Sequence, residues 1–217
     1  MSSILPHHIS GNNFVVSAHK CLYWEEEKAL ILSDLHLGKS GHFRKNGIPV
    51  PQHAFKEDMQ RLFSLIQFYS PQKVIIAGDL FHSHSNKEHD FFVRWRNDIP
   101  ATAIELVLGN HDILENWYAG AGINVHKGSL EIKDICFTHD ILDSDSSNEK
   151  YIISGHIHPS VKMKGTGKQS LHLPCFYFGK KYAVLPAFGG FTGTHSIRPL
   201  KGDSVFAVVE KTVIKLQ

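Results

Sequence analysis

Residues 29–38 read ALILSDLHLG, an apolar run that passes directly into an aspartate and a histidine. The run 29–33 has the length and composition of a buried β-strand. Asp34 and His36 follow it at i and i+2, and two residues at this spacing in an extended backbone point to the same side. We therefore expect one carboxylate and one imidazole to reach a common centre just beyond this strand.

The same arrangement, an apolar run followed at once by polar side chains, recurs at four places further along the chain. The runs predicted as strands are 73–77, 103–108, 130–138 and 151–154. The polar residues that follow these runs are Asp79, Asn110, His111, Asp112, His139, His156 and His158. Because the ligands of open α/β sheets gather outside the carboxyl ends of the strands, we expect five segments to meet at one edge.

The residue types in these segments are those of a metal site. Carboxylate, amide and imidazole groups suit manganese, iron or zinc ions, and the lack of a thiolate disfavours a structural zinc site. Gly78, Gly109 and Gly155 precede three of the polar groups and would let the backbone approach a metal or a phosphate closely. One such segment alone is better explained by capping or turn residues, whereas five in this order after strands indicate a metal centre.

The rest of the chain alternates predicted strands and helices in its first half, and strands dominate the second half. Helices are predicted at 51–69 and 87–98 from the spacing of their apolar residues. Further strands are predicted at 161–164, 171–178, 182–185 and 204–214. This order predicts an α/β fold with two packed β-sheets flanked by helices. A length of 217 residues fits one domain.

The composition excludes few classes of function. A formal net charge of +2 is too mild to indicate a nucleic-acid-binding protein, and it does not exclude one. The sequence has no run of 18 apolar residues, so it predicts no membrane span. Residues 1–10 lack the pattern of a signal peptide. The cysteines Cys21, Cys136 and Cys175 form no C-x-x-C pair, so we expect buried thiols and a cytoplasmic location.

The series D-x-H, GD, GNHD, H and GHxH, which runs from Asp34 to His158, resembles the calcineurin-like metallophosphoesterase superfamily. The resemblance implies a β-sandwich flanked by helices, in a single metallophosphoesterase domain over residues 1–217. It also implies two divalent metal ions, with manganese as the first choice and iron or zinc as the alternatives.

The resemblance further implies a role for each residue of the series. The first metal would bind Asp34, His36 and His158, and the second Asn110, His139 and His156. Asp79 would bridge the two ions. His111 would be the catalytic histidine, with Asp112 holding its ring. The fourth motif of the family is often Gly-His, whereas Thr138 precedes His139 here, so this ligand departs from the family pattern.

A closer resemblance lies in the residues that flank these motifs. The flanking segments are 34–51, 78–83, 155–159, 173–176 and 185–193. Together they are similar to the ligase-associated DNA-damage-response phosphoesterases, a group encoded beside an ATP-dependent DNA ligase, a helicase and a second nuclease. This similarity implies a cytoplasmic repair nuclease or endonuclease that acts on DNA and is associated with a ligase and a helicase.

Several residues around the metal ligands are candidate substrate contacts. Lys39, His42, Arg44 and Lys45 follow the first motif closely and would meet phosphates, although a solvated basic turn explains them equally well. His82 follows Asp79 and would line the site, with a polar helix entry as the alternative. The glycine-rich segment 188–193 would bring backbone N–H groups to a phosphate, or it is a plain turn.

Three functions remain open from the sequence. The first is a phosphodiesterase that acts as a nuclease on DNA. The second is a small-molecule phosphodiesterase or nucleotide pyrophosphatase with the same chemistry. The third is a non-catalytic scaffold of the same fold. A basic groove with exposed aromatic residues would favour the first, and a closed small pocket would favour the second.

Overall fold

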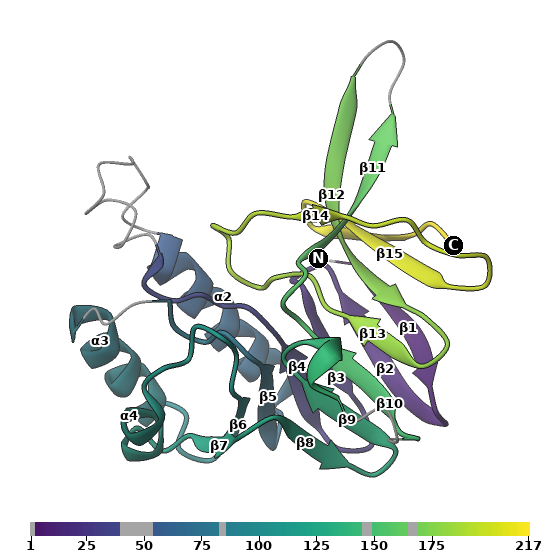
Figure 1. Cartoon of the computed structure of the whole chain (residues 1–217). Helices are drawn as coiled ribbons and strands as arrows, with labels where there is room; N and C mark the ends of the chain where they lie inside the picture. Colours follow the sequence, from purple (N-terminus) through teal and green to yellow (C-terminus); the bar gives the residue numbers. More distant parts are fainter. Residues whose placement is uncertain (1–2, 40–53, 83–85, 145–148, 165–168) are drawn as a thin grey trace.

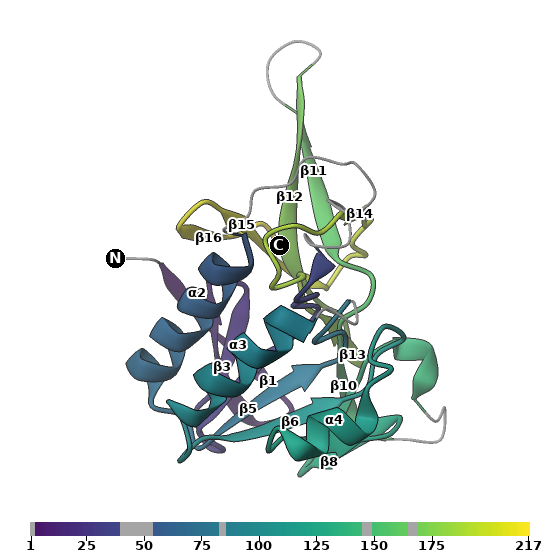
Figure 2. The same cartoon turned by 90° about the vertical axis from the view of Figure 1, so that its left-hand side faces the viewer.

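The computed structural model describes residues 3–39, 54–82, 86–144, 149–164 and 169–217. Two β-sheets pack face to face, and helices cover the outer face of the first sheet (Figures 1 and 2). The predicted α/β class, with two packed sheets flanked by helices, is therefore confirmed. None of the helices in the described ranges has the length and apolar content needed to cross a lipid bilayer.

The first sheet has seven strands within the described part of the chain, in the order β1-β2-β3-β4-β5-β6-β7. Their bounds are β1 Ile4–Ile9, β2 Asn12–Ser17, β3 Cys21–Trp24, β4 Ala29–Leu32, β5 Lys73–Ala77, β6 Ala103–Val107 and β7 Asn124–His126. β1 to β4 pair antiparallel, whereas β4 to β7 pair in parallel. The parallel pairing brings the carboxyl ends of β4, β5 and β6 to one edge of the sheet, where the site lies.

The central strands are buried on both faces, which explains their uninterrupted apolar sequence. In β4, Leu30 and Leu32 face the helices, and Ala29 and Ile31 face the second sheet. This alternation follows from the pleat of the strand. Both faces therefore need apolar side chains, and the first polar residues appear only where the strand ends.

Within the described part of the chain, three α-helices pack against the first sheet. Their bounds are α2 Ala54–Tyr69, α3 Asn86–Asn97 and α4 Glu115–Gly120. α2 buries Phe55, Met59, Leu62 and Ile66 in the core beneath the sheet, as their spacing predicts. The helices predicted at 51–69 and 87–98 are confirmed for the described residues, whereas the short α4 was not predicted.

The second sheet runs in the order β14-β11-β12-β13-β10-β9-β8, and β15 and β16 extend it from β12. Its bounds are β8 Ser129–Ile132, β9 Ile135–Thr138, β10 Tyr151–Ser154, β11 Pro159–Lys164, β12 Ser170–Phe178, β13 Tyr182–Val184, β14 His195–Ser196, β15 Ser204–Val209 and β16 Thr212–Lys215. β9, β10 and β13 are parallel neighbours. The carboxyl ends of β9 and β10 therefore face the same edge as those of the first sheet.

Two long predicted strands are each a hairpin, so this part of the prediction was wrong. The run 130–138 breaks into β8 and β9 at Lys133, and the run 204–214 breaks into β15 and β16 at Glu210. Both residues take the left-handed backbone, with φ of 50° and 52°. Each hairpin turns through two residues, and such tight turns use positive φ because it matches the twist of the flanking strands.

Candidate metal centre

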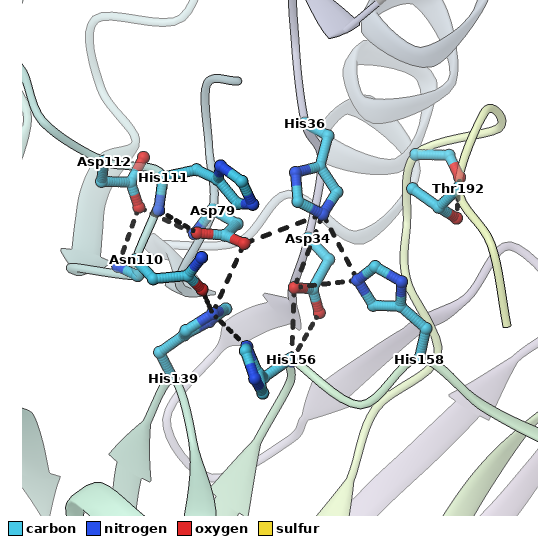
Figure 3. A network of polar contacts seen from close by, with 12 residues as sticks. Asp34, His36, Asp79, Asn110, His111, Asp112, His139, His156, His158 and Thr192 are labelled. Atoms are coloured by element: carbon cyan, nitrogen blue, oxygen red, sulfur yellow. Dashed lines mark hydrogen bonds and ion pairs between the residues drawn. The ribbon is translucent and has the colours of Figure 1, made fainter. Parts of the chain in front are cut away.

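The structure brings the predicted ligands and the predicted catalytic pair together at the shared edge of the two sheets (Figure 3). The residues gathered there are Asp34, His36, Asp79, Asn110, His111, Asp112, His139, His156 and His158. They lie after the ends of β4, β5, β6, β9 and β10. His42, Arg44 and Lys45 lie outside the described residues. His82 lies beside the gathered histidines, where its ring centroid is 4.3 Å from that of His111.

One group of ligand atoms forms around Asp34. The Nε2 atom of His158 lies 3.2 Å from Oδ1 of Asp34, and the Nε2 atoms of His36 and His158 are 3.3 Å apart. His36 Nε2 also lies 3.9 Å from Asp34 Oδ1 and 3.7 Å from Oδ2 of Asp79. This group contains the three residues that the resemblance assigns to the first metal. Through His36 it also contacts Asp79, the predicted bridging carboxylate.

A second group forms around His139. Its Nε2 atom lies 3.0 Å from Oδ1 of Asn110, 3.1 Å from Nδ1 of His156 and 3.4 Å from Oδ2 of Asp79. The same Asp79 oxygen therefore belongs to both groups. His139, whose motif departs from the family pattern, sits as close to the other groups as any predicted ligand.

These donor atoms fit divalent cations. Metal–ligand bonds of about 2.0–2.2 Å place neighbouring ligand atoms about 3.0–3.5 Å apart, which matches most of the separations in both groups. Asp34 and Asp79 are 0% and 2% exposed, and a buried carboxylate needs a positive partner. The ring nitrogens of His36 and His158 face one another, and two neutral imidazoles do this favourably only when a proton or a cation lies between them.

Burial and charge shift the pKa values of three residues of the centre. Burial lowers the pKa of His36 to about 3, which leaves the neutral imidazole that a metal needs. Burial also opposes the charged forms of Asp79 and His139. Their mutual contact outweighs that cost, lowering the pKa of Asp79 to about 2 and raising that of His139 to about 9.

Five of the predicted ligands hold a strained backbone. Their φ angles are 53° at Asp34, 48° at His36, 55° at Asp79, 65° at His156 and 50° at His158. Non-glycine residues avoid this left-handed region, and such strain persists where the surrounding structure enforces it, commonly at functional sites. The extended D-x-H and H-x-H segments that we expected are therefore wrong in local geometry, although their side chains do converge.

Three glycines keep space for the ligand of a neighbouring segment. A Cβ atom at Gly78 would lie 2.0 Å from Nδ1 of His139, and one at Gly109 would lie 2.3 Å from Oδ1 of Asp79. At Gly155 it would lie 2.4 Å from Oδ2 of Asp34. In the described structure these glycines thus make room for ligand side chains of neighbouring segments.

Backbone N–H groups fix the orientation of the two carboxylates. The N–H of His156 donates to both oxygens of Asp34, at 3.2 and 3.1 Å. The N–H of His111 donates to Oδ1 of Asp79 at 2.9 Å, which leaves Oδ2 for the two ligand groups. Each of these bonds joins segments that are far apart in the sequence, so the centre is held by the packing of both sheets.

Asp112 has partners that differ from the prediction. Its carboxylate accepts hydrogen bonds from the backbone N–H groups of Asp79, Leu80 and Gly109, at 2.7, 3.0 and 3.0 Å. The Tyr118 hydroxyl donates to it at 2.7 Å. With both oxygens engaged in this way, Asp112 ties the end of β5 to the end of β6 instead of holding the ring of His111.

We expect Asp112→Ala to destabilise the metal-free protein by about 3 kcal/mol or more, because it leaves several buried donors without an acceptor. Urea denaturation in the presence of chelator measures this loss. Asp112→Asn keeps one acceptor oxygen and should lose less. If Asp112→Ala were as stable as wild type but had low activity, the result would instead support the predicted role of Asp112, which is to hold the ring of His111.

Comparison with known proteins places the chain in a family. Residues 28–158, which contain the whole motif series, match the model of the calcineurin-like phosphoesterases. The crystal structure of the nuclease MPE of Pseudomonas putida is similar over 99% of this chain and 100% of that one, with 24% sequence identity and a TM-score of 0.84. A search of curated proteins gives no match. The chain belongs to the calcineurin-like phosphoesterases, a family of metal-using hydrolases that act on phosphoester bonds.

Proposed function

We propose that the chain is a two-metal phosphodiesterase that cleaves DNA. The single observation that supports two metals best is the position of Asp79, whose Oδ2 atom lies within 3.7 Å of His36 and 3.4 Å of His139. One carboxylate oxygen shared between two groups of ligand atoms is the arrangement expected for a bridging ligand. The first ion would be held by Asp34, His36 and His158, and the second by Asn110, His139 and His156.

The metals would supply a nucleophilic water at neutral pH and offset the negative charge that develops on the phosphate. The protein's own contribution is to fix the ligands and to move a proton. His111 stands at the edge of the centre, with its ring centroid 5.4 Å from that of His36. We assign it as the general acid that donates a proton to the leaving oxygen. Its backbone N–H holds Asp79, so the acid and the bridging carboxylate are positioned together.

We propose manganese as the metal, with iron or zinc as the alternatives. The ligand set mixes imidazole nitrogens with carboxylate and amide oxygens, and such mixed sets suit these ions. The three cysteines, Cys21, Cys136 and Cys175, are buried, and none of them belongs to a group of described side chains that could hold a metal ion. Free buried thiols agree with a reducing compartment, so we also propose a cytoplasmic location.

DNA is the proposed substrate for two reasons. The motifs that flank the ligands are similar to those of repair-associated phosphoesterases, and a nuclease shares the fold over almost the whole chain. We extend this to a role as an endonuclease in DNA repair, together with an ATP-dependent DNA ligase and a helicase. The scaffold alternative is disfavoured, because every ligand type is present and the ligand atoms converge.

The test is hydrolysis of bis(p-nitrophenyl) phosphate, p-nitrophenyl phosphate, single-stranded DNA and duplex DNA, with added Mn²⁺ and with chelator. We expect manganese-dependent cleavage of the diester and of DNA, and complete loss with chelator. Cleavage of the model diester without DNA would indicate a small-molecule phosphodiesterase. A chain that binds metal but turns over none of the four substrates would contradict the proposal.

A further inference from the structure

A loop formed by residues 188–193, named here the rim loop, stands directly beside the metal centre. It begins on the ligand segment after β4, where the N–H groups of Phe188 and Gly189 donate to the carbonyls of Ser33 and Asp34 at 2.9 and 3.0 Å. It ends at Gly193, whose carbonyl lies 3.1 Å from Nδ1 of His158. Figure 3 shows Thr192 of this loop on the His158 side of the centre.

Helix α2 fixes the rim loop in place. Asp58 accepts a hydrogen bond from the N–H of Gly190 at 3.0 Å, and Arg61 donates to the carbonyl of Phe188. Arg61 is also paired with Asp58 at 2.7 Å and lies 4.1 Å above the ring of Phe188. A loop tied by both its backbone and a partly buried ion pair loses little conformational entropy when a ligand binds.

The close contact at Gly189 leaves no room for a side chain. A Cβ atom there would lie 2.4 Å from the carbonyl oxygen of Leu35. Glycine is therefore needed for the backbone of the rim loop to pass this close to the backbone of the ligand segment. The N–H groups of Phe188, Gly189 and Gly190 are all bonded within the protein. The expected delivery of backbone N–H groups to a phosphate therefore does not occur over residues 188–190.

The rim loop instead presents an aromatic side chain at the centre. Phe191 is 39% exposed, although the loop that carries it is firmly anchored. It lines a hollow that also includes His36 and Lys39. Lys39, Phe191 and Thr192 also line an open groove of about 270 Å³. An ammonium group and an aromatic ring thus line this groove, and the same two residues line the hollow at His36, a proposed metal ligand.

We propose that this groove binds the nucleotide next to the scissile phosphate, with Phe191 stacked on its base and Lys39 against its phosphate. The inference rests on the proposed function, and it names the substrate as an unpaired nucleic-acid strand. Aromatic side chains stack on any base, so this subsite would accept any of the four bases but would require that the base be exposed. A lysine supplies a point charge that suits the backbone phosphate without dictating geometry.

The test compares a single-stranded oligonucleotide with one of equal length that is abasic on both sides of the cleavage position. We expect wild type to prefer the base-containing strand by about tenfold or more in kcat/KM, mainly through KM. In Phe191→Ala this ratio should fall close to one, and Phe191→Trp should restore it. Phe68→Ala, which removes a 73% exposed ring from α2, is the matched control and should keep the wild-type ratio.

Lys39 is tested by its salt dependence. Lys39→Gln should weaken binding of both oligonucleotides. It should also make the slope of log affinity against log salt concentration shallower, by the amount expected for the loss of one phosphate contact. A wild-type ratio in Phe191→Ala, or an unchanged salt slope in Lys39→Gln, would overturn the assignment of that residue while leaving the proposed nuclease intact. If wild type cleaves neither oligonucleotide but hydrolyses the model diester, the DNA proposal fails, and the subsite fails with it.

Discussion

His111→Ala is expected to lower kcat on DNA by about 10²–10⁴-fold while metal content stays at the wild-type level, the range typical of a lost general acid. The two effects separate because the ring and the backbone of His111 do different things. The N–H group that holds Oδ1 of Asp79 is retained by alanine. Only the imidazole, which lies beside His36 and His82, is removed.

The leaving group provides the sharper measurement for this variant. An alkoxide released from DNA needs a proton, whereas p-nitrophenolate is weakly basic and departs without one. The loss in kcat should therefore be much smaller on bis(p-nitrophenyl) phosphate than on DNA. His172→Ala, an exposed histidine on β12, is the matched control and should behave as wild type. Equal losses on the two substrates, or a loss of bound metal, would show that His111 is not the acid.

Asp79→Asn is expected to lower metal affinity by more than about 10²-fold and to abolish cleavage. Mutation of a residue that only orients a metal ligand typically lowers metal affinity or activity by about 10–100-fold. Asp79 lies in both ligand groups itself, so its loss should cost more. The neutral amide removes the negative charge that two neighbouring cations would share. Metal analysis of the purified variant, after incubation with Mn²⁺ and desalting, measures the first effect directly.

Thermal unfolding gives a second readout of Asp79→Asn that does not depend on activity. A metal present at about 100 times its Kd stabilises the wild-type chain by about 2.7 kcal/mol, so Mn²⁺ should raise its Tm. This rise should vanish in the variant. Asp203→Asn is the control. It alters a buried carboxylate that accepts a hydrogen bond from Tyr177, and this variant should keep the rise in Tm with Mn²⁺. A Tm that still rises with Mn²⁺ in Asp79→Asn would exclude the bridging role.

The sequence predicts the central strands β4 and β5, whereas the edge strand β1 was not predicted. β4 and β5 are continuous apolar runs because side chains on each face enter a core. β1 alternates between exposed and partly buried residues and carries His7 and His8, so its composition resembles that of a loop. It becomes a strand through pairing with β2, a tertiary effect that the local sequence does not contain.

The positions of the site residues are predictable from the strand ends, whereas their backbone and their supporting contacts are not. Left-handed φ at Asp34 and His36 is unfavourable locally and is imposed only by the packed structure. Asp112 follows His111 directly, yet three of its hydrogen-bond donors lie 31–33 positions earlier, at the end of β5. Arg61 reaches Phe188 across 127 positions, and no motif announces that contact.

The hydrogen bonds from His156 to Asp34 join residues 122 positions apart, and this separation bears on synthesis in the cell. Closing so long a segment costs chain entropy before any contact repays it. A nascent chain that has emerged only as far as β9 already displays Asp34, His36, Asp79 and Asn110, but it lacks the three histidines that complete the proposed ligand set, His139, His156 and His158. With the proposed ligand set, complete coordination of both metals must therefore wait until His158 has emerged from the ribosome.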